Sequence, residues 1–247
     1  MINKYFTQRT SVRSFSSKNV PEEIIEAIVS AAAKAPTCGN MQLYTIIETR
    51  KTDLKEKLAE QHFNQPAAAT APVILTICAD FNRFSQWCEI SDAAPGYNNF
   101  HSFIVALTDA VIMAQQITTI AEMEGLGTCY LGTVNYNAEN ISKLLELPDL
   151  VVPVASLAIG YIEKESEPTE RLPLNAILHK EAYRHDSEEE IKALFKEKED
   201  FPANKEFVQI NKKPNLAHVF TEIRYPKEMN EAVSSSFLEL LKKKGFA

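Results

Sequence analysis

The side chains with the most evident chemistry stand near the start of the chain. Arg9, Thr10, Ser11 and Arg13 fall within five positions of an otherwise acidic sequence. A guanidinium group can hold a phosphate through two parallel N–H donors, and neighbouring hydroxyl groups add further donors. The cluster therefore indicates a site for one phosphate monoester. The alternative interpretation is a solvated basic turn that precedes a helix.

The overall charge excludes several classes of partner. The chain has 26 basic residues (Lys and Arg) against 33 acidic ones, which gives a net charge of −7. Proteins that bind nucleic acid normally present a broad basic face, so we expect no nucleic-acid partner. Polar residues interrupt the apolar stretch 103–121, so we expect no membrane span. The four scattered cysteines and the lack of a signal segment predict free thiols and a cytoplasmic location.

Motifs for other kinds of catalysis are missing from the sequence. The stretch GLGTCYLG at 125–132 places its last glycine two positions too late for a dinucleotide-binding fingerprint. No phosphate-binding loop of the G-x-x-x-x-G-K-S/T type and no G-x-S-x-G elbow occurs. The five histidines are not spaced as metal ligands, so we expect no metal site. The arginine-rich cluster at residues 9–13 is the candidate site that remains.

Hydrophobic patterning predicts the elements that position the cluster. Strands are predicted at 44–48, 72–78, 128–131 and 151–162. Helices are predicted at 21–35, 53–61, 101–124 and 138–146, the last with Asn137 as its cap. Residues 82–100 contain Pro95-Gly96 and are predicted to be irregular. The helix at 101–124 is apolar nearly all round, which is typical of a core or a subunit interface. Asp109 within it is expected to be a cap or an interface partner.

The composition changes after residue 162. An acidic loop at 163–170, a solvated helix at 186–199 and a mobile loop at 200–216 are predicted there. An amphipathic helix follows at 228–244. These patterns favour an α+β layered domain over residues 1–185 and a C-terminal arm over 186–247.

Five stretches, taken in order, resemble the FMN-dependent nitroreductase family. They are RTSVRSF, AAAKAPTCGNMQLYTIIE, GLGTCYLG, VPVASLAIGYI and ERLPLNAILHKEAY. The resemblance covers residues 4 to about 185, and the ending LLKKKGFA resembles the branch of oxygen-insensitive NADPH nitroreductases and flavin reductases. It implies a mixed β-sheet sandwiched by helices. It also implies a homodimer in which the arm wraps the partner.

The resemblance also implies which residues hold FMN. The phosphate and ribityl chain would be held by Arg9, Thr10, Ser11 and Arg13, with Arg171 completing the clamp. The residues implied near the flavin ring are Thr37, Cys38, Asn40, Gln65, Tyr130, Leu131 and Gly132. Among these, the segment 37–40 would approach the flavin of the neighbouring chain, and Gln65 would meet the polar edge of the ring. Residues 130–132 would line one side, with a backbone N–H near flavin N5.

Two positions depart from the family pattern. Thr10 and Thr169 stand where basic side chains are common in the family. The phosphate charge would therefore be balanced by Arg9, Arg13 and Arg171.

The implied activity is a ping-pong oxidoreduction. NADPH (or NADH) would pass a hydride to the flavin and leave, and a small flat oxidised acceptor would then stack in the same place. Nitroaromatics, quinones and free flavin fit this description. No catalytic side chain is assigned, because the chemistry would occur at flavin N5. The alternative is a non-catalytic flavin-binding or interaction protein on the same fold.

Overall fold

The computed structural model describes residues 4–247, which form two compact units. The first unit comprises residues 4–166 and 233–247, and the second comprises Glu167–Ala232. The division differs from the predicted boundary at 185, and it groups the last fifteen residues with the first unit. That residues 186–247 wrap a partner subunit stays a prediction.

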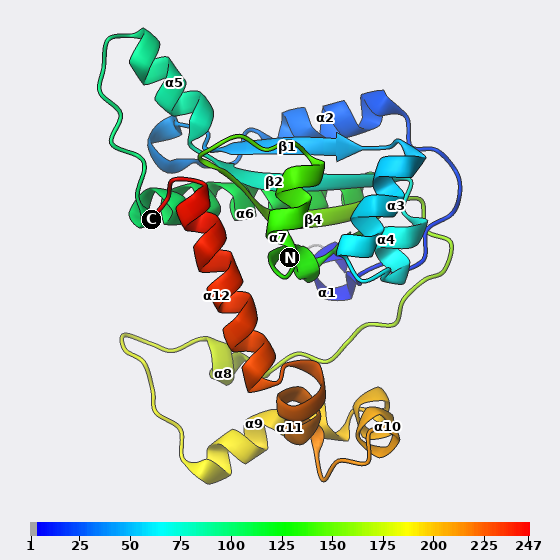
Figure 1. The fold of residues 1–247 in the computed structure, drawn as a ribbon. Helices are drawn as coiled ribbons and strands as arrows, with labels where there is room; N and C mark the ends of the chain where they lie inside the picture. Colours follow the sequence, from blue (N-terminus) through cyan, green and yellow to red (C-terminus); the bar gives the residue numbers. More distant parts are fainter. Residues whose placement is uncertain (1–3) are drawn as a thin grey trace. The chain divides into compact units, whose positions relative to one another are not determined.

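A four-stranded sheet forms the centre of the first unit (Figure 1). Its strands are β1 (Tyr44–Thr49), β2 (Val73–Asp80), β3 (Gly127–Tyr130) and β4 (Val151–Gly160), in the order β1-β2-β4-β3. All four predicted strands are confirmed. The expectation of a mixed sheet, with both parallel and antiparallel pairs, is wrong within residues 4–247. Each strand runs antiparallel to its neighbours.

Helices cover both faces of the sheet, as expected. Strands β2 and β4 are buried along their whole length, and alternate side chains of β2 point to opposite faces. Val73, Leu75 and Ile77 join the large core cluster that includes α2 (Glu22–Ala32) and α6 (Phe100–Met123). Ile74 packs in a second cluster with α3 (Thr52–Gln61) and α7 (Ala138–Leu144).

The long helix α6 is the core helix that the sequence predicts. Ala106, Ala110 and Ile117 on its inner face are fully buried in the large core cluster. By length and composition alone α6 could cross a membrane, but its buried face has the packing of a core helix. Gly125 ends it at a φ of +82°, and the N–H of Leu126 donates to the carbonyl of Ala121.

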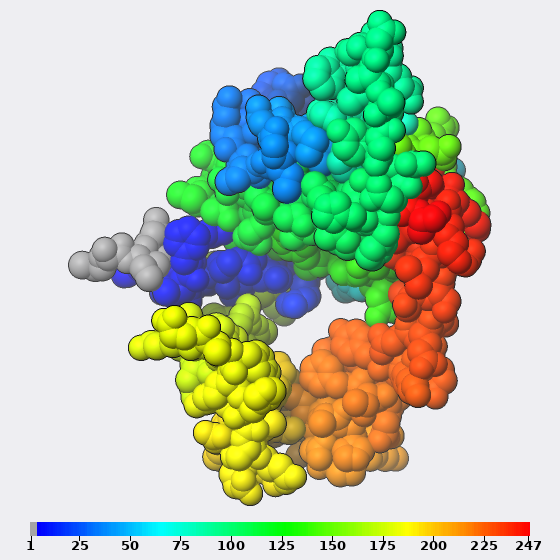
Figure 2. Space-filling model, turned by 90° about the vertical axis from the view of Figure 1, so that its left-hand side faces the viewer, coloured from blue at the N-terminus to red at the C-terminus, as the bar shows by residue number. Residues whose placement is uncertain are grey.

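Several elements of the first unit were not predicted. Residues 82–100 are not irregular throughout, because α5 (Asn82–Ile90) buries Ser85 and Cys88 one turn apart on the same face. This helix projects away from the sheet (Figures 1 and 2). Asn137 stands before α7, but its side chain makes no cap hydrogen bond to that helix. The other unpredicted elements are α1 (Lys4–Gln8), η1 (Cys38–Asn40), α4 (Pro66–Thr70) and η2 (Gly132–Asn135).

The second unit is helical. It contains α8 (Leu174–Ile177), α9 (Glu188–Asp200), α10 (Pro202–Ile210), α11 (Leu216–Val219), η3 (Phe220–Arg224) and the start of α12 (Lys227–Lys243). The helices predicted at 186–199 and 228–244 are confirmed. The prediction of a loop at 200–216 is wrong, because residues 202–210 form helix α10. Pro202 occupies the first turn of this helix, where a missing N–H breaks no hydrogen bond.

The end of the chain packs into the core of the first unit. Leu240, Leu241 and Phe246 are almost fully buried there. The rings of Phe246 and Phe103 lie 5.5 Å apart between centroids, in a tilted arrangement. These contacts attach residues 240–246 to the core of the first unit.

The segment after α1 lies along the sheet. The N–H of Val12 donates to Thr128 O at 2.9 Å, and the N–H of Ser16 donates to Tyr161 O at 2.9 Å. Gly127 and Gly160 stand opposite each other in the β3–β4 register. A Cβ atom on Gly127 would lie 2.7 Å from Val12 Cγ2, and one on Gly160 would lie 2.5 Å from Pro72 Cδ. Glycine is therefore required at both positions for this close approach.

We expect Gly160→Ala to lower the free energy of unfolding by about 1–3 kcal/mol, because the added methyl group overlaps the Pro72 ring. Urea unfolding followed by circular dichroism measures this change. Gly96→Ala is the matched control, since its Cβ would meet no atom within 4 Å. Equal losses in the two variants would contradict the steric explanation.

Candidate functional site

Two donors of the N-terminal cluster are free to bind a ligand. Arg13 is exposed and Ser11 is half-buried, on the segment held along β3. Within residues 4–247, neither side chain forms a hydrogen bond or an ion pair. Their N–H and O–H groups therefore remain available for an anion.

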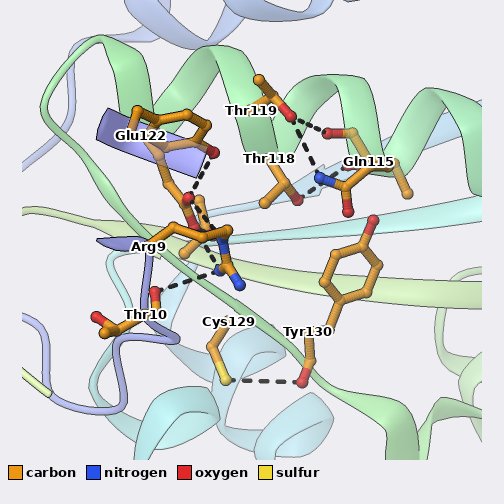
Figure 3. Close-up of polar contacts among 11 residues, drawn as sticks. Arg9, Thr10, Gln115, Thr118, Thr119, Glu122, Cys129 and Tyr130 are labelled. Atoms are coloured by element: carbon orange, nitrogen blue, oxygen red, sulfur yellow. Dashed lines mark hydrogen bonds and ion pairs between the residues drawn. The ribbon is translucent and has the colours of Figure 1, made fainter. Parts of the chain in front are cut away.

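Arg9, in contrast, is bound to a residue that the sequence analysis did not identify. Its Nε donates to Glu122 Oε2 at 3.0 Å and its Nη2 to Glu122 Oε1 at 2.9 Å (Figure 3). Tyr5 and Thr128 donate their hydroxyl protons to the same carboxylate, at 2.7 and 2.5 Å. Burial alone would raise the pKa of Glu122, but these donors lower it. The carboxylate thus balances the charge of Arg9, whose contact with a phosphate stays a prediction.

The turn that contains Cys38 and Asn40 is held by another acid of α6. Asp109 is 1% exposed, and it accepts the N–H of Cys38 at 2.8 Å and that of Leu43 at 3.2 Å. The expected capping role of Asp109 is therefore fulfilled within this chain, on backbone groups about seventy residues away. Thr37 begins the turn, and its hydroxyl oxygen is buried with no hydrogen-bond partner among residues 4–247.

The cysteines differ in accessibility. All four carry free thiols, and Cys38 in this turn is exposed. The other three, Cys78, Cys88 and Cys129, are buried. Burial raises the pKa of the Cys78 thiol to about 12, so that this group stays protonated and unreactive.

Gln65 lies in a tight turn between α3 and α4. Phe63 and Asn64 both adopt positive φ values, 55° and 49°, which are unusual for residues other than glycine. The N–H of Asn64 donates to Ala59 O at 2.8 Å, and the N–H of Gln65 donates to His62 O at 3.2 Å. Gln65 is then the half-buried residue that precedes α4.

Residues 130–132 leave the sheet at the end of β3. Leu131 is fully buried, and its N–H donates to Ser156 O at 2.8 Å, so this amide is not available to a ligand. Gly132 is exposed at the start of η2. Tyr130 is 39% exposed, and its ring lies beside Thr118 and Gln115 of α6 (Figure 3). Partial burial raises the pKa of Tyr130, so the phenol is neutral at ordinary pH.

Arg171 belongs to the second unit. Its Nη1 donates to Thr169 Oγ1 at 2.6 Å and to Glu170 O at 2.9 Å. The neighbouring Glu170 pairs with Lys198 at 2.8 Å, which lowers the pKa of its carboxyl group. The part of Arg171 in a phosphate clamp stays a prediction.

His62 joins the turn of Gln65 to the turn of Gly132. Its Nδ1 lies 2.9 Å from Thr133 Oγ1, and the ring is fully buried. Burial lowers the pKa of His62 from 6.5 to about 4. Sequence reasoning had no signal for this residue beyond its nearness to Gln65. No cluster of potential metal ligands is present among residues 4–247.

The buried His62 should make stability depend on pH. Its ring stays neutral in the folded protein, whereas the unfolded chain takes up a proton below pH 6.5. The contribution of the neutral His62 to the free energy of unfolding is therefore fully present above that pH. It is lost as the pH falls towards 4, by about 3 kcal/mol in total. Urea unfolding across this range should show a shallower loss in His62→Asn, which does not titrate there. Parallel pH profiles for the two proteins would contradict this origin.

Comparison with known proteins adds independent findings. The sequence model of the nitroreductase family matches residues 6–161. The protein named FMN reductase (NAD(P)H) of Bacillus subtilis strain 168 is 36% identical over 187 residues, which cover 75% of each chain. The protein named oxygen-insensitive NADPH nitroreductase of Salmonella typhimurium is 32% identical over 174 residues, 70% of this chain and 71% of the other. A crystal structure of a Bacteroides fragilis protein superimposes with a TM-score of 0.97 at 40% identity, covering 99% of both chains.

Proposed function

This chain belongs to the nitroreductase family, and on that premise we propose that it oxidises NADPH or NADH and passes the electrons, through bound FMN, to a small flat oxidised acceptor. Relatives named for FMN reduction and for nitroreduction support this activity. The structural observation that carries it is the set of uncommitted donors at Ser11 and Arg13. Val12 between them packs in one cluster with Ala67, which follows Gln65, and Leu131, which precedes Gly132.

The residues present fit FMN. Arg13 and Ser11 offer free donors for its phosphate, and the orphaned hydroxyl of Thr37 would gain a partner from a bound ligand. Gly132 offers an exposed backbone position near the ring, whereas the amide of Leu131 is used by the sheet. When bound, FMN would supply the two-electron chemistry that exchanges a hydride between nicotinamide and acceptor.

The proposed tasks of the side chains follow from these surroundings. Arg13 would carry most of the positive charge at the phosphate, because Glu122 balances Arg9 and Thr10 has no charge. Ser11 and Thr10 would add hydroxyl donors, and Arg171 would complete the clamp. Gln65 would bind the polar edge of the flavin ring, and the neutral Tyr130 with Leu131 and Gly132 would line one side. Thr37, Cys38 and Asn40 would border the flavin of the neighbouring chain.

A homodimer is part of the proposal. Phe100, Ile104 and Val111 of α6 are exposed in the isolated chain, and their spacings of four and seven residues place them on one face of the helix, so that their exposure leaves an apolar face in water. A partner subunit that covers this face would shield it from water. The free thiols favour a cytoplasmic location.

We expect purified protein to bind FMN and to oxidise NADPH when menadione or nitrofurazone is present, because the donor set suits a flavin phosphate. Flavin absorbance and the loss of NADPH absorbance at saturating acceptor measure the two properties. Bound flavin without turnover would favour the alternative of a non-catalytic flavin-binding protein. A protein that cannot be loaded with FMN would contradict both.

Arg13→Ala should weaken FMN binding about 10- to 100-fold, the loss expected for one charge-assisted contact. A fluorescence-quenching titration of the apoprotein with FMN measures the dissociation constant. Lys57→Ala is the control, since it removes an exposed positive charge from α3 with the same change in net charge. Unchanged affinity in Arg13→Ala would remove this residue from the phosphate site.

Arg171→Ala tests whether the second unit contributes a residue to the phosphate clamp. If Arg171 contacts the phosphate, this variant should weaken FMN binding to a similar degree as Arg13→Ala. The same titration measures it. An affinity equal to that of Lys57→Ala would restrict the clamp to the first unit.

A further inference from the structure

Three consecutive residues at the end of α3 contact the chain that follows Gly132. The carbonyl of Gln61 accepts from Asn137 Nδ2 at 2.7 Å, and its side-chain oxygen accepts from Asn140 Nδ2 at 3.2 Å. His62 Nδ1 lies 2.9 Å from Thr133 Oγ1. The ring of Phe63 meets that of Tyr136 edge-on, with centroids 6.0 Å apart. We call these contacts the α3–η2 seam.

The side chain of Asn137 contributes to the seam and does not cap α7. A residue of this type before a helix normally accepts an N–H of the first turn. Here its side-chain amide instead donates to the carbonyl of Gln61, and it makes no cap hydrogen bond. The side chain thus joins the start of α7 to the end of α3.

His62 lies at the centre of the seam, and the burial of its ring there costs free energy. The side chain is fully buried, and its Nε2 has no hydrogen-bond partner among residues 4–247. A neutral imidazole has one donor nitrogen and one acceptor nitrogen, so either tautomer leaves one of them unpaired. An apolar side chain would fill the space without this cost. The presence of histidine therefore points to a need for the contact with Thr133, beyond packing.

The hydrogen bond connects two turns that are both assigned to the flavin ring. On one side, Gln65 follows His62 by three residues, through the positive φ values of Phe63 and Asn64. On the other side, Gly132 immediately precedes Thr133. A strained turn persists only when surrounding contacts hold it, and the seam supplies those contacts.

We propose that His62 is a positioning residue whose contact with Thr133 fixes the Gln65 turn against the Gly132 turn, and so sets how the flavin ring is held. This inference rests on the proposed function for its second half. Its first half, the coupling of the two turns, concerns the protein without any ligand.

The coupling is tested on the apoprotein by amide hydrogen exchange. Thr133→Val removes the hydroxyl but keeps the shape of the side chain, whereas Thr133→Ser keeps the hydroxyl. In the valine variant we expect exchange at residues 63–65 and 132–136 to accelerate together by about fivefold, the change expected for one lost hydrogen bond. The serine variant should exchange like the unsubstituted protein. Acceleration in only one turn, or in neither, would overturn the coupling.

The effect on the flavin is tested by FMN titration and by the visible absorption bands of the bound flavin. Thr133→Val and His62→Leu should raise the FMN dissociation constant about fivefold and alter the bands. Thr133→Ser and His62→Asn, whose amide can replace Nδ1, should keep the dissociation constant and the bands of the unsubstituted protein. Ser142→Ala is the matched control, because this buried hydroxyl on α7 donates to Ala138 O within its own helix.

The outcomes separate the inference from the function. If the unsubstituted protein does not bind FMN, the proposed function and the flavin half of the inference fail, while hydrogen exchange still decides the coupling. If FMN binds but its affinity and bands are the same in Thr133→Val as in Thr133→Ser, the positioning role is overturned. If His62→Leu does not fold, the Thr133 pair alone decides both halves.

Discussion

The close contact between the N-terminal segment and the edge of the sheet sets the geometry of the candidate site. Gly127 and Gly160 face each other across β3 and β4, and a methyl group on either would overlap a neighbour. The bare backbone of Gly127 leaves room for Val12, whose N–H bonds to Thr128, while that of Gly160 leaves room for Pro72 and the ring of Phe15. Because backbone hydrogen bonds fix the N-terminal segment, Ser11 and Arg13 are held at a defined place beside the sheet.

Helix α6 packs in the core and also holds two segments of the chain that carry proposed site residues. Its apolar residues pack under the sheet, and it also carries two acids that are largely shielded from water, Asp109 and Glu122. A shielded carboxylate must find donors, so each one binds a segment that arrives from elsewhere in the sequence. Asp109 takes backbone amides of the Cys38 turn, and Glu122 takes Arg9. The same helix thus holds two segments proposed to contact flavin, the Cys38 turn for the flavin of the neighbouring chain and Arg9 for that of its own chain.

The sequence predicted the layered fold because its signals are local and strong. Strands β2 and β4 and helix α6 are long apolar runs, and all four strands and α6 lie within a few residues of their predicted ends. The helices α5 and α10 were missed because proline, glycine and asparagine nearby were read as marks of irregular chain. The spacing of Ser85 and Cys88 and the initial position of Pro202 were the available signals.

Long-range partners within the site could not be predicted. Asp109 reaches Cys38, and Glu122 reaches Arg9, across 71 and 113 positions of sequence. Nothing in the local pattern tells which carboxylate a given amide or guanidinium will meet. The antiparallel order of the sheet was likewise hidden, since strand patterns fix burial and leave direction open.

The uneven burial of the thiols has a practical consequence. Cys38 is exposed in the turn held by Asp109, while Cys78, Cys88 and Cys129 are enclosed. A maleimide dye should therefore attach to the native chain at one position, without prior removal of the other sulfur atoms. The turn would then carry an optical reporter of ligand arrival.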